Sequence, residues 1–476
     1  MHQIVEGDTQ SLSDVALFVE AVNGLEGQKL FDDADIVVTR APGRLDVMGG
    51  IADYSGSLVL EMPIAEATHV ALQRNGSGVL KIASLGADEN ERAFDFEMSM
   101  SVFDGMNYAS AQAFFQKDPA RSWAAYVAGV FLVLMRERGV VFDGGAQILI
   151  ASDVPEGKGV SSSAAIEVAT MQAVVAAFGL AIEAKELAIL CQMVENLVVG
   201  APCGVMDQVT SACGHADQLV ALLCQPAELQ TPVTIPGDLA VWGIDSGIRH
   251  AVSGADYGSV RVGAFMGYRI LADLAGLEVT DGTPMQIADP IWQGYLANIT
   301  PGLFEQKFQN QIPDQMRGDA FLSQYGGTTD SVTQIDPERD YAIRIPCLHP
   351  VYEHFRVQTY GALLRDVAKE SVRKLLGELM YQAHASYSAC GLGSDGTDRL
   401  VEMVREAGVD RGVYGAKITG GGSGGTVAIL GRADAGDVVS NIALEYAEES
   451  GREPYIFSGS SPGAGAFGHI VLRAES

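Results

Sequence analysis

The segment 155–165, Pro-Glu-Gly-Lys-Gly-Val-Ser-Ser-Ser-Ala-Ala, constrains the fold more than any other part of the sequence. A short apolar run at 146–150 precedes it, and an apolar run from Ala164 to Phe178 follows. This pattern is typical of a strand, a glycine-rich loop and a helix. Glycines let backbone N–H groups approach an anion closely, and the helix N-terminus adds unsatisfied donors and a positive dipole end. The segment therefore predicts a cradle for nucleotide phosphates.

The cradle does not match the common phosphate-binding motifs. Gly157-Lys158-Gly159 does not supply the order G-x-x-x-x-G-K-[ST], and the motif set of protein kinases is missing. Two stretches, 391–396 and 420–425, match G-x-G-x-x-G, but the first ends an expected helix and the second leads into an expected strand. Taken alone, the cradle segment also fits an ordinary strand-to-helix turn with a serine cap, so the rest of the sequence must decide.

Length and charge limit the possible partners. The chain has 476 residues, enough for two domains or one large two-lobed unit, and 47% of them are hydrophobic. Its net charge of −29 repels nucleic-acid backbones and anionic lipid surfaces, so we expect neither as a partner. A nucleotide must then be held by local donors and Mg²⁺ rather than by the overall charge.

The cysteines and the hydrophobic runs predict a cytoplasmic protein. The six cysteines form no C-x-x-C pair, which is typical of reduced thiols in a large cytosolic chain. The first residues show no secretory signal, and no apolar run reaches the roughly 18 residues that suggest a membrane span.

The remaining patterns outline the chain. Glycines, a proline and two acids predict an irregular loop at 40–54, after a strand at 36–39. Between 278 and 345 the chain is weakly periodic, and only local helices are expected there. Further strands are expected at 58–60, 68–73, 79–84 and 240–245, and helices at 13–22, from 122 onward, at 164–178, 184–199, 259–275, 357–389 and 397–407.

Three separated segments, 41–54, 155–165 and 420–425, resemble the three signature motifs of the GHMP small-molecule kinases. The first segment has the sugar 1-kinase form found in galactokinases, and 202–208 also resembles a galactokinase segment. A closer resemblance, to the kinase domain of the L-arabinokinases, lies in 48–56, 242–250 and 349–353 and extends from about residue 36 to the end.

The resemblance implies an α+β fold in two lobes with the active site in the cleft between them. The N-terminal lobe, expected at 1–229, is ribosomal-S5-like, and the C-terminal lobe, expected at 230–476, is ferredoxin-like.

The resemblance also implies catalytic roles. Asp207 corresponds to the carboxylate beside the sugar C1 hydroxyl, as general base or as the group that orients the nucleophile. Arg44 corresponds to its cationic partner, which keeps Asp207 ionised and stabilises phosphoryl charge. Glu195 matches a Mg²⁺ carboxylate, with Ser162 or Ser163 as the hydroxyl ligand, and such oxygen ligands suit Mg²⁺.

For the sugar, the resemblance implies that Asp53 accepts hydrogen bonds from ring hydroxyls, that Tyr257 binds another hydroxyl and that Gly204 offers a backbone donor. Helical spacing alone would place Trp123 and Tyr126 in the core, whereas the resemblance places them near the adenine. The residues expected to contact ATP are Ser84, Trp123, Tyr126, Gly157, Lys158, Gly159, Val160, Ser161, Ser162, Ser163, Gly421 and Gly422.

Gly50 and Ile51 depart from the galactokinase pattern, which has Glu-His here and uses the glutamate to reach the hydroxymethyl oxygen of galactose. L-Arabinopyranose shares the ring stereochemistry of galactose and lacks that carbon, so losing its polar partners favours a pentose, although a glycine could also leave room for the hydroxymethyl group. We therefore expect a Mg·ATP-dependent kinase that converts L-arabinose to β-L-arabinose 1-phosphate.

Two alternatives remain. One is a kinase for another galacto-configured sugar: D-galactose, D-fucose or galacturonate. The other is a sugar and ATP sensor without turnover, which the presence of both Asp207 and Arg44 disfavours. The sequence leaves open the oligomeric state, the role of 278–345, which serine binds Mg²⁺ and whether Asp207 is a true base.

Overall fold

The computed structural model describes residues 1–86, 95–249 and 255–475. His250, which belongs to one of the segments resembling the arabinokinases, lies outside the described residues. Among the described helices, none is long and apolar enough to cross a membrane.

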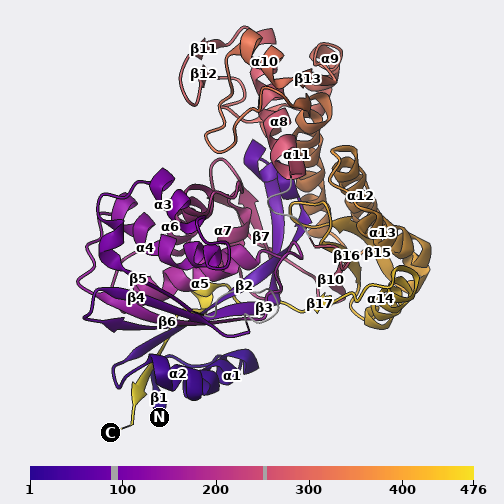
Figure 1. The fold of residues 1–476 in the computed structure, drawn as a ribbon. Helices are drawn as coiled ribbons and strands as arrows, with labels where there is room; N and C mark the ends of the chain where they lie inside the picture. The colour runs from indigo at the N-terminus through magenta and orange to yellow at the C-terminus, as the bar shows by residue number, and fades with distance from the viewer. Residues whose placement is uncertain (87–94, 250–254, 476) are drawn as a thin grey trace.

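A large sheet forms the N-terminal lobe (Figure 1). Strand β7 (Gln218–Leu223) pairs with β3 and carries the short strands β8 (Glu228–Leu229) and β9 (Val233–Thr234). The main strand order is β1 (His2–Glu6), β18 (Ile470–Ala474), β2 (Ile36–Met48), β3 (Leu58–Asn75), β6 (Gly145–Ser152), β4 (Val79–Ser84) and β5 (Asp95–Ser99).

Both faces of this sheet are covered. Alternation along the strands sends Val70 and Ile148 to one face and Ala71 and Leu149 to the other. Helices α1 (Ser13–Val22) and α2 (Leu25–Leu30) cover the second face. The first face carries α3 (Tyr108–Phe115), α4 (Ala125–Glu137), α5 (Ser162–Ala177), α6 (Ala184–Met193) and α7 (Met206–Cys213).

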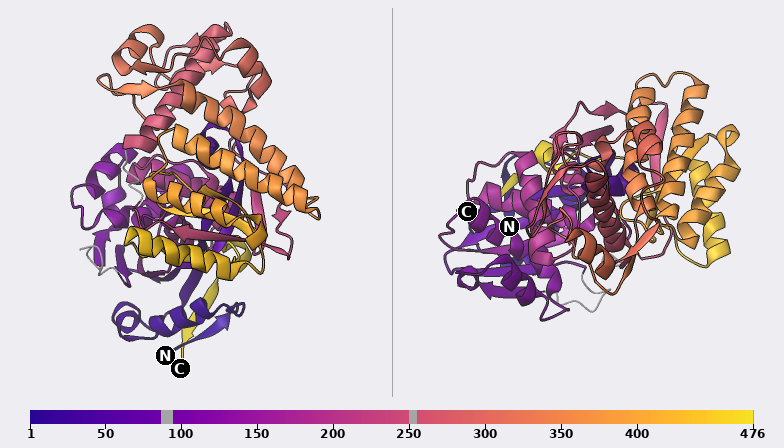
Figure 2. Two further views of the ribbon diagram at one scale, coloured as in Figure 1. Left: turned by 90° about the vertical axis from the view of Figure 1, so that its right-hand side faces the viewer. Right: turned by 90° about the horizontal axis from the view of Figure 1, so that it is seen from above.

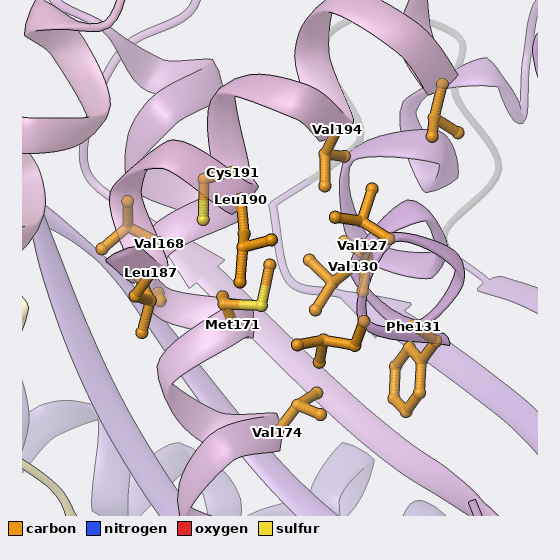
Figure 3. Close-up of a cluster of buried hydrophobic side chains, with 14 of the residues drawn as sticks. Val127, Val130, Phe131, Val168, Met171, Val174, Leu187, Leu190, Cys191 and Val194 are labelled. Atoms are coloured by element: carbon orange, nitrogen blue, oxygen red, sulfur yellow. The ribbon is translucent and has the colours of Figure 1, made fainter. Parts of the chain in front are cut away.

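The main core lies between these helices and the sheet. Figure 3 shows Val130 of α4, Met171 of α5 and Leu190 of α6 pointing toward one another. Helix α5, which begins at the end of the cradle, is largely buried and rich in alanine and valine. The segment 155–165 is therefore anchored to the main core of the lobe.

The C-terminal lobe has a four-stranded antiparallel sheet in the order β15 (Val413–Ile418), β16 (Thr426–Arg432), β10 (Leu239–Asp245) and β17 (Ile456–Ser458). Along the chain these strands and their crossover helices follow a β-α-β-β-α-β order, which confirms the ferredoxin-like expectation. The helices are α11 (Arg344–Leu364), α12 (Glu370–Ala389), α13 (Asp395–Ala407) and α14 (Gly436–Ser450).

The segment that follows β10 forms a projecting body above the two sheets (Figures 1 and 2). Its core, which includes Leu271, Trp292, Phe304 and Phe321, is separate from the other cores. The body contains α8 (Ala255–Leu274), β11 (Glu278–Thr280), β12 (Gln286–Ala288), α9 (Pro301–Lys307), β13 (Gln315–Arg317), α10 (Gly318–Tyr325) and β14 (Asp340–Ala342).

The two chain ends lie together. After the short helix α15 (Ala464–Phe467), strand β18 pairs with both β1 and β2, so the end of the chain completes the N-terminal sheet. Figure 2 shows the two termini side by side from both directions.

Four element predictions were wrong. The segment 278–345, where only local helices were expected, also forms two short antiparallel pairs, β11 with β12 and β13 with β14. The expected loop at 40–54 is a continuation of β2 through Met48, because bulges at Pro42/Arg44 and Asp46/Met48 accommodate the irregular residues, and a 3₁₀ helix follows at Gly50–Ser55. The strands expected at 58–60 and 68–73 are the single strand β3. The long helix expected at 357–389 is two helices, α11 and α12, because the chain turns between them with Val367 packed into the core.

Candidate active site

The cradle has an unusual start to its helix. Ser161 is the N-cap of α5 but adopts a left-handed conformation, with φ 63° and ψ 47°, and its side chain makes no capping hydrogen bond. Its Oγ is buried without a hydrogen-bond partner among the described residues. An ordinary serine-capped turn would use that oxygen on the helix itself, so this segment is a different structure.

The glycine run 420–425 packs directly on the cradle. A Cβ on Gly425 would lie 2.8 Å from the Lys158 carbonyl oxygen, and one on Gly420 would lie 2.8 Å from that of Gly159. The Thr426 hydroxyl donates to the Lys158 carbonyl at 2.8 Å. Glycines are required here because two backbones approach too closely for side chains.

A cleft of about 1100 Å³ opens beside the cradle and is lined by residues of both lobes. Two of its lining residues, Lys158 of the cradle and Asp245 at the end of β10, form an ion pair. Of the residues expected to contact ATP, Ser84, Trp123, Tyr126, Gly157, Lys158, Ser162 and Ser163 line this cleft. The others, Gly159, Val160, Ser161, Gly421 and Gly422, are not among its lining residues.

Trp123 reconciles the two sequence interpretations. It lines the cleft, yet it is only 9% exposed and belongs to the main core. Its indole Nε1 has no hydrogen-bond partner among the described residues, and Tyr126 lies half-buried one turn further along. The two rings therefore form an aromatic wall of the cleft, in which the indole Nε1 of Trp123 has a hydrogen bond left to donate.

Arg44 and Asp207 meet beside the cradle. Arg44, on β2, donates from Nε to Asp207 Oδ1 at 2.9 Å, and its Nη2 lies 2.8 Å from the same oxygen. Arg44 Nη1 donates to the Gly159 carbonyl at 2.8 Å, so the guanidinium links the carboxylate to the phosphate cradle. Burial works to lower the pKa of Arg44, but the nearby carboxylates, Asp207 foremost, raise it above its ordinary value.

Glu61 on β3 contacts Arg44 of this pair, and the sequence analysis did not identify it. Its Oε2 lies 3.3 Å from Arg44 Nε, and its side chain is fully buried. Burial, and then the charge of Asp46, raise its pKa well above the ordinary value. An acidic residue inside the apolar run 58–62 was the available signal.

Glu195 lies in a π-helical turn, Val194–Val199, that continues α6. Gln208 donates to it at 2.7 Å and also to buried Glu167 at 3.1 Å. Burial and the charge of Asp207 raise the pKa of Glu195 to about 7. Hydrogen bonds from Ser163, Cys203 and Gln208 lower this pKa and only partly offset the rise. π-Turns are frequent at functional sites because they displace one side chain from the helical register.

The oxygens of Glu195 and Ser163 form a hard donor pair beside the cradle that fits Mg²⁺, an ion that takes few protein ligands and completes its shell with water and phosphate. Within the described ranges, no group of three or more His, Cys, Asp or Glu side chains could hold a metal alone.

The expected sugar residues gather around the 3₁₀ helix Gly50–Ser55. Asp53 is 4% exposed, and a Cβ on Gly204 would lie 1.5 Å from its Oδ2, so only glycine fits beside this carboxylate. Burial, and then the charge of Asp207, raise the pKa of Asp53 to about 7. Tyr257 packs on Tyr54 with ring centroids 6.0 Å apart, on the same side of the site.

Tyr387 of α12 occupies the space over Gly50. A Cβ on Gly50, whose φ is +45°, would lie 1.5 Å from the Tyr387 hydroxyl oxygen. That oxygen accepts from the Ile51 N–H at 2.8 Å and donates to the Gly420 carbonyl at 3.1 Å. No periodic or motif signal marked this tyrosine, because only the tertiary fold brings it to the glycine.

A fully buried ion pair lies next to Gly50. It joins Asp46 Oδ2 of β2 to Lys417 Nζ of β15 at 2.6 Å. Asp46 Oδ1 accepts from the Gly50 N–H at 3.1 Å, and Asp46 N–H donates to the Thr419 hydroxyl at 2.7 Å. These contacts fix the start of the 3₁₀ helix Gly50–Ser55 to the C-terminal lobe.

Family models match three parts of the chain. GHMP kinases N terminal domain matches residues 125–215, GHMP kinases C terminal matches 364–468, and the galactokinase galactose-binding signature matches 28–74. The matched regions contain the cradle, the glycine run and the Arg44 strand.

Two curated relatives are similar along most of the chain. An Arabidopsis thaliana L-arabinokinase is 47% identical over 99% of this chain, and the chain spans 52% of that relative's length. A galactokinase from Chloroflexus aggregans is 28% identical over 89% of this chain and 92% of its own.

Solved structures share the fold. The Lactococcus lactis galactokinase complexed with galactose has a TM-score of 0.73 at 19% identity, covering 95% of this chain and 99% of its own. The Methanococcus jannaschii mevalonate kinase has a TM-score of 0.54 at 12% identity, over 89% and 98%. With both lobes matched by sequence and fold, the chain belongs to the GHMP kinase family.

Proposed function

We propose that this protein transfers the γ-phosphoryl group of ATP to the anomeric hydroxyl of L-arabinose, giving β-L-arabinose 1-phosphate. The Arg44–Asp207 pair carries this proposal, because it joins a carboxylate, a guanidinium and the cradle backbone within hydrogen-bond distances. The 47% identity to an L-arabinokinase supports the same reaction.

Asp207 is the group that receives or orients the proton of the attacking hydroxyl. Its side chain is 21% exposed, open enough to reach a sugar, and two nitrogens of Arg44 hold its Oδ1 in place. The same guanidinium, bonded to the Gly159 carbonyl, lies where charge on a transferring phosphoryl group would need stabilisation.

ATP would occupy the cleft with its phosphates at the cradle and its base against Trp123 and Tyr126. Ser163 and Glu195 would hold Mg²⁺, which neutralises phosphate charge when bound. Ser162 lines the same cleft and is the alternative hydroxyl ligand.

The pentose preference rests on Tyr387. Its hydroxyl fills the place that any side chain at position 50 would need, so Gly50 does not leave an empty pocket there. A filled pocket disfavours a substrate that carries an extra hydroxymethyl group at this point.

D-Galactose is the second candidate substrate, with D-fucose and galacturonate as further galacto-configured sugars. It is favoured by the galactose-binding signature over residues 28–74.

We also propose that the reaction takes place in the cytoplasm. All six cysteines are unpaired, which suits a reducing compartment.

The test is product formation by purified protein with ATP and L-arabinose. We expect ADP release and a new sugar phosphate whose phosphorus couples to the anomeric proton in ³¹P NMR. EDTA should abolish both, and MgCl₂ in excess should restore them. No turnover of any pentose or hexose in the presence of Mg·ATP would refute the proposal.

A further inference from the structure

Arg261 of α8 connects the projecting body to the 202–204 loop. Its Nε and Nη2 donate to the two oxygens of Asp330 at 2.9 and 2.8 Å, and its Nη1 donates to the Cys203 carbonyl at 3.2 Å. The two charged side chains are only 7% and 2% exposed. Such a pair of parallel hydrogen bonds fixes the orientation of the planar guanidinium as well as pairing its charge.

Asp330 is itself held firmly. Its oxygens accept from the backbone N–H groups of Val332 at 3.1 Å and Thr333 at 3.2 Å, and from the Thr333 hydroxyl at 2.5 Å. Because Asp330 lies within the projecting body, that body supplies a rigid anchor for the arginine.

On the other side, Arg261 reaches the loop that precedes Asp207. Cys203 adjoins Gly204, which lies directly against the Asp53 carboxylate, and the Cys203 N–H is held by Asn196 at 2.9 Å. The guanidinium carbon also lies 5.4 Å from the centroid of the Tyr54 ring. One guanidinium therefore supports both backbone segments that carry the expected sugar contacts.

Arg261 also acts through charge. Burial and the charge of Asp207 raise the pKa of Asp53. Among the groups that lower this pKa, Arg261 has the largest effect. The charged or titratable groups that face Asp53 are Asp207 of α7, Arg44 of β2, Arg261 and Tyr257 of α8, the neighbouring Tyr54, and the thiols of Cys203 and Cys224.

Building on the proposed sugar-kinase function, we propose that Arg261 is a positioning residue for sugar binding. Held by Asp330, it fixes the 202–204 loop and favours the negatively charged form of Asp53, the form that accepts hydrogen bonds from the sugar. The projecting body, whose role the sequence left open, is thus part of the sugar site.

The test compares Arg261→Met, Arg261→Lys and Asp330→Asn with the wild type from pH 6 to 9. Arg269→Met is the matched control, because Arg269 is a buried arginine of the same helix that lies 5.2 Å over the Tyr325 ring, within the projecting body. Thermal melting and ATP binding confirm that each variant is folded.

For Arg261→Met we expect the sugar KM to rise by about 10-fold or more at pH 7, while the ATP KM stays within about 2-fold. Without the cation, the pKa of Asp53 moves further up, so the KM penalty should grow below pH 7 and shrink toward pH 9. Arg261→Lys should keep the wild-type pH profile, because it retains the positive charge. It should lose part of the affinity for the sugar, because an ammonium group cannot reproduce the paired hydrogen bonds of the guanidinium to Asp330. Asp330→Asn should give an intermediate KM, and Arg269→Met a wild-type one.

An equal KM penalty at every pH, or an equal rise in the ATP KM, would contradict the proposal. So would a penalty of the same size in Arg269→Met. If the wild type turned over no sugar, the proposed function would fail instead, and calorimetric titration of the same variants with L-arabinose would still decide the role of Arg261.

Discussion

The proposed nucleotide half of the site and its proposed sugar half are built differently. The nucleotide half is an open cleft whose lining comes from a glycine-rich loop, part-exposed serines and two aromatic residues. In the proposed sugar half, Arg44 is 2% and Asp53 4% exposed, and the fully buried Asp46–Lys417 ion pair holds the backbone at Gly50.

This difference indicates a division of work. Glycines and backbone groups can hold a triphosphate of fixed shape without a tightly packed site. A sugar that differs from its relatives by one hydroxymethyl group needs buried polar groups already held in position. We therefore expect substitutions in the sugar half to cost more than substitutions in the nucleotide half.

The largest effect is expected where the two halves meet. Asp207→Asn removes the charge that accepts or orients the proton, so kcat should fall by about 10³-fold, roughly 4 kcal/mol in the barrier. The sugar and nucleotide should still bind, because the amide keeps the shape of the carboxylate. Steady-state kinetics and calorimetric binding measure both quantities, and a kcat near that of the wild type would exclude Asp207 as the base.

An intermediate effect is expected in the packed sugar half. Gly50→Ala places a methyl group 1.5 Å from the Tyr387 hydroxyl at a φ of +45°, so the variant should lose about 2–4 kcal/mol of unfolding free energy. Urea unfolding measures this loss, and the sugar KM should rise with it.

Gly179→Ala is the matched control, because Gly179 has a φ of +64° and, apart from its two chain neighbours, no described residue has an atom within 4 Å of its Cβ position. It should cost about 1 kcal/mol from backbone strain alone. Equal losses in the two variants would show that Tyr387 does not fill the space over Gly50.

The smallest effect is expected in the cradle. Ser161→Ala removes a hydroxyl without a partner among the described residues, so unfolding free energy should change by less than about 0.5 kcal/mol. The ATP KM should rise by only about 2- to 5-fold, because neighbouring backbone donors remain. A rise above about 100-fold would mean that the nucleotide half is as finely arranged as the sugar half.

The same contrast explains what the sequence predicted. The cradle is contiguous, so a strand, two glycines and a helix marked it directly, and the helix at Ser13–Val22 and the strand at Val79–Ser84 were predicted to the residue. Arg44 and Asp207 came from the family resemblance, and the structure places them 2.8 Å apart.

Contacts between distant segments could not be predicted. Tyr387 reaches Ile51 across 336 positions of the chain, and Arg261 reaches Asp330 across 69, with no local pattern to mark either pair. Strand β2 was misjudged because Pro42 and Gly43 suggested a loop, whereas bulged pairing with β3 accommodates them.

The most direct test of the account is the ratio of kcat/KM for L-arabinose to kcat/KM for D-galactose, measured with wild-type protein and saturating Mg·ATP. Because the Tyr387 hydroxyl occupies the space over Gly50, we predict a ratio of about 10 to 200 in favour of L-arabinose. A ratio of one or below would show that the site accepts the hydroxymethyl group, and would contradict the assignment of this kinase to a pentose.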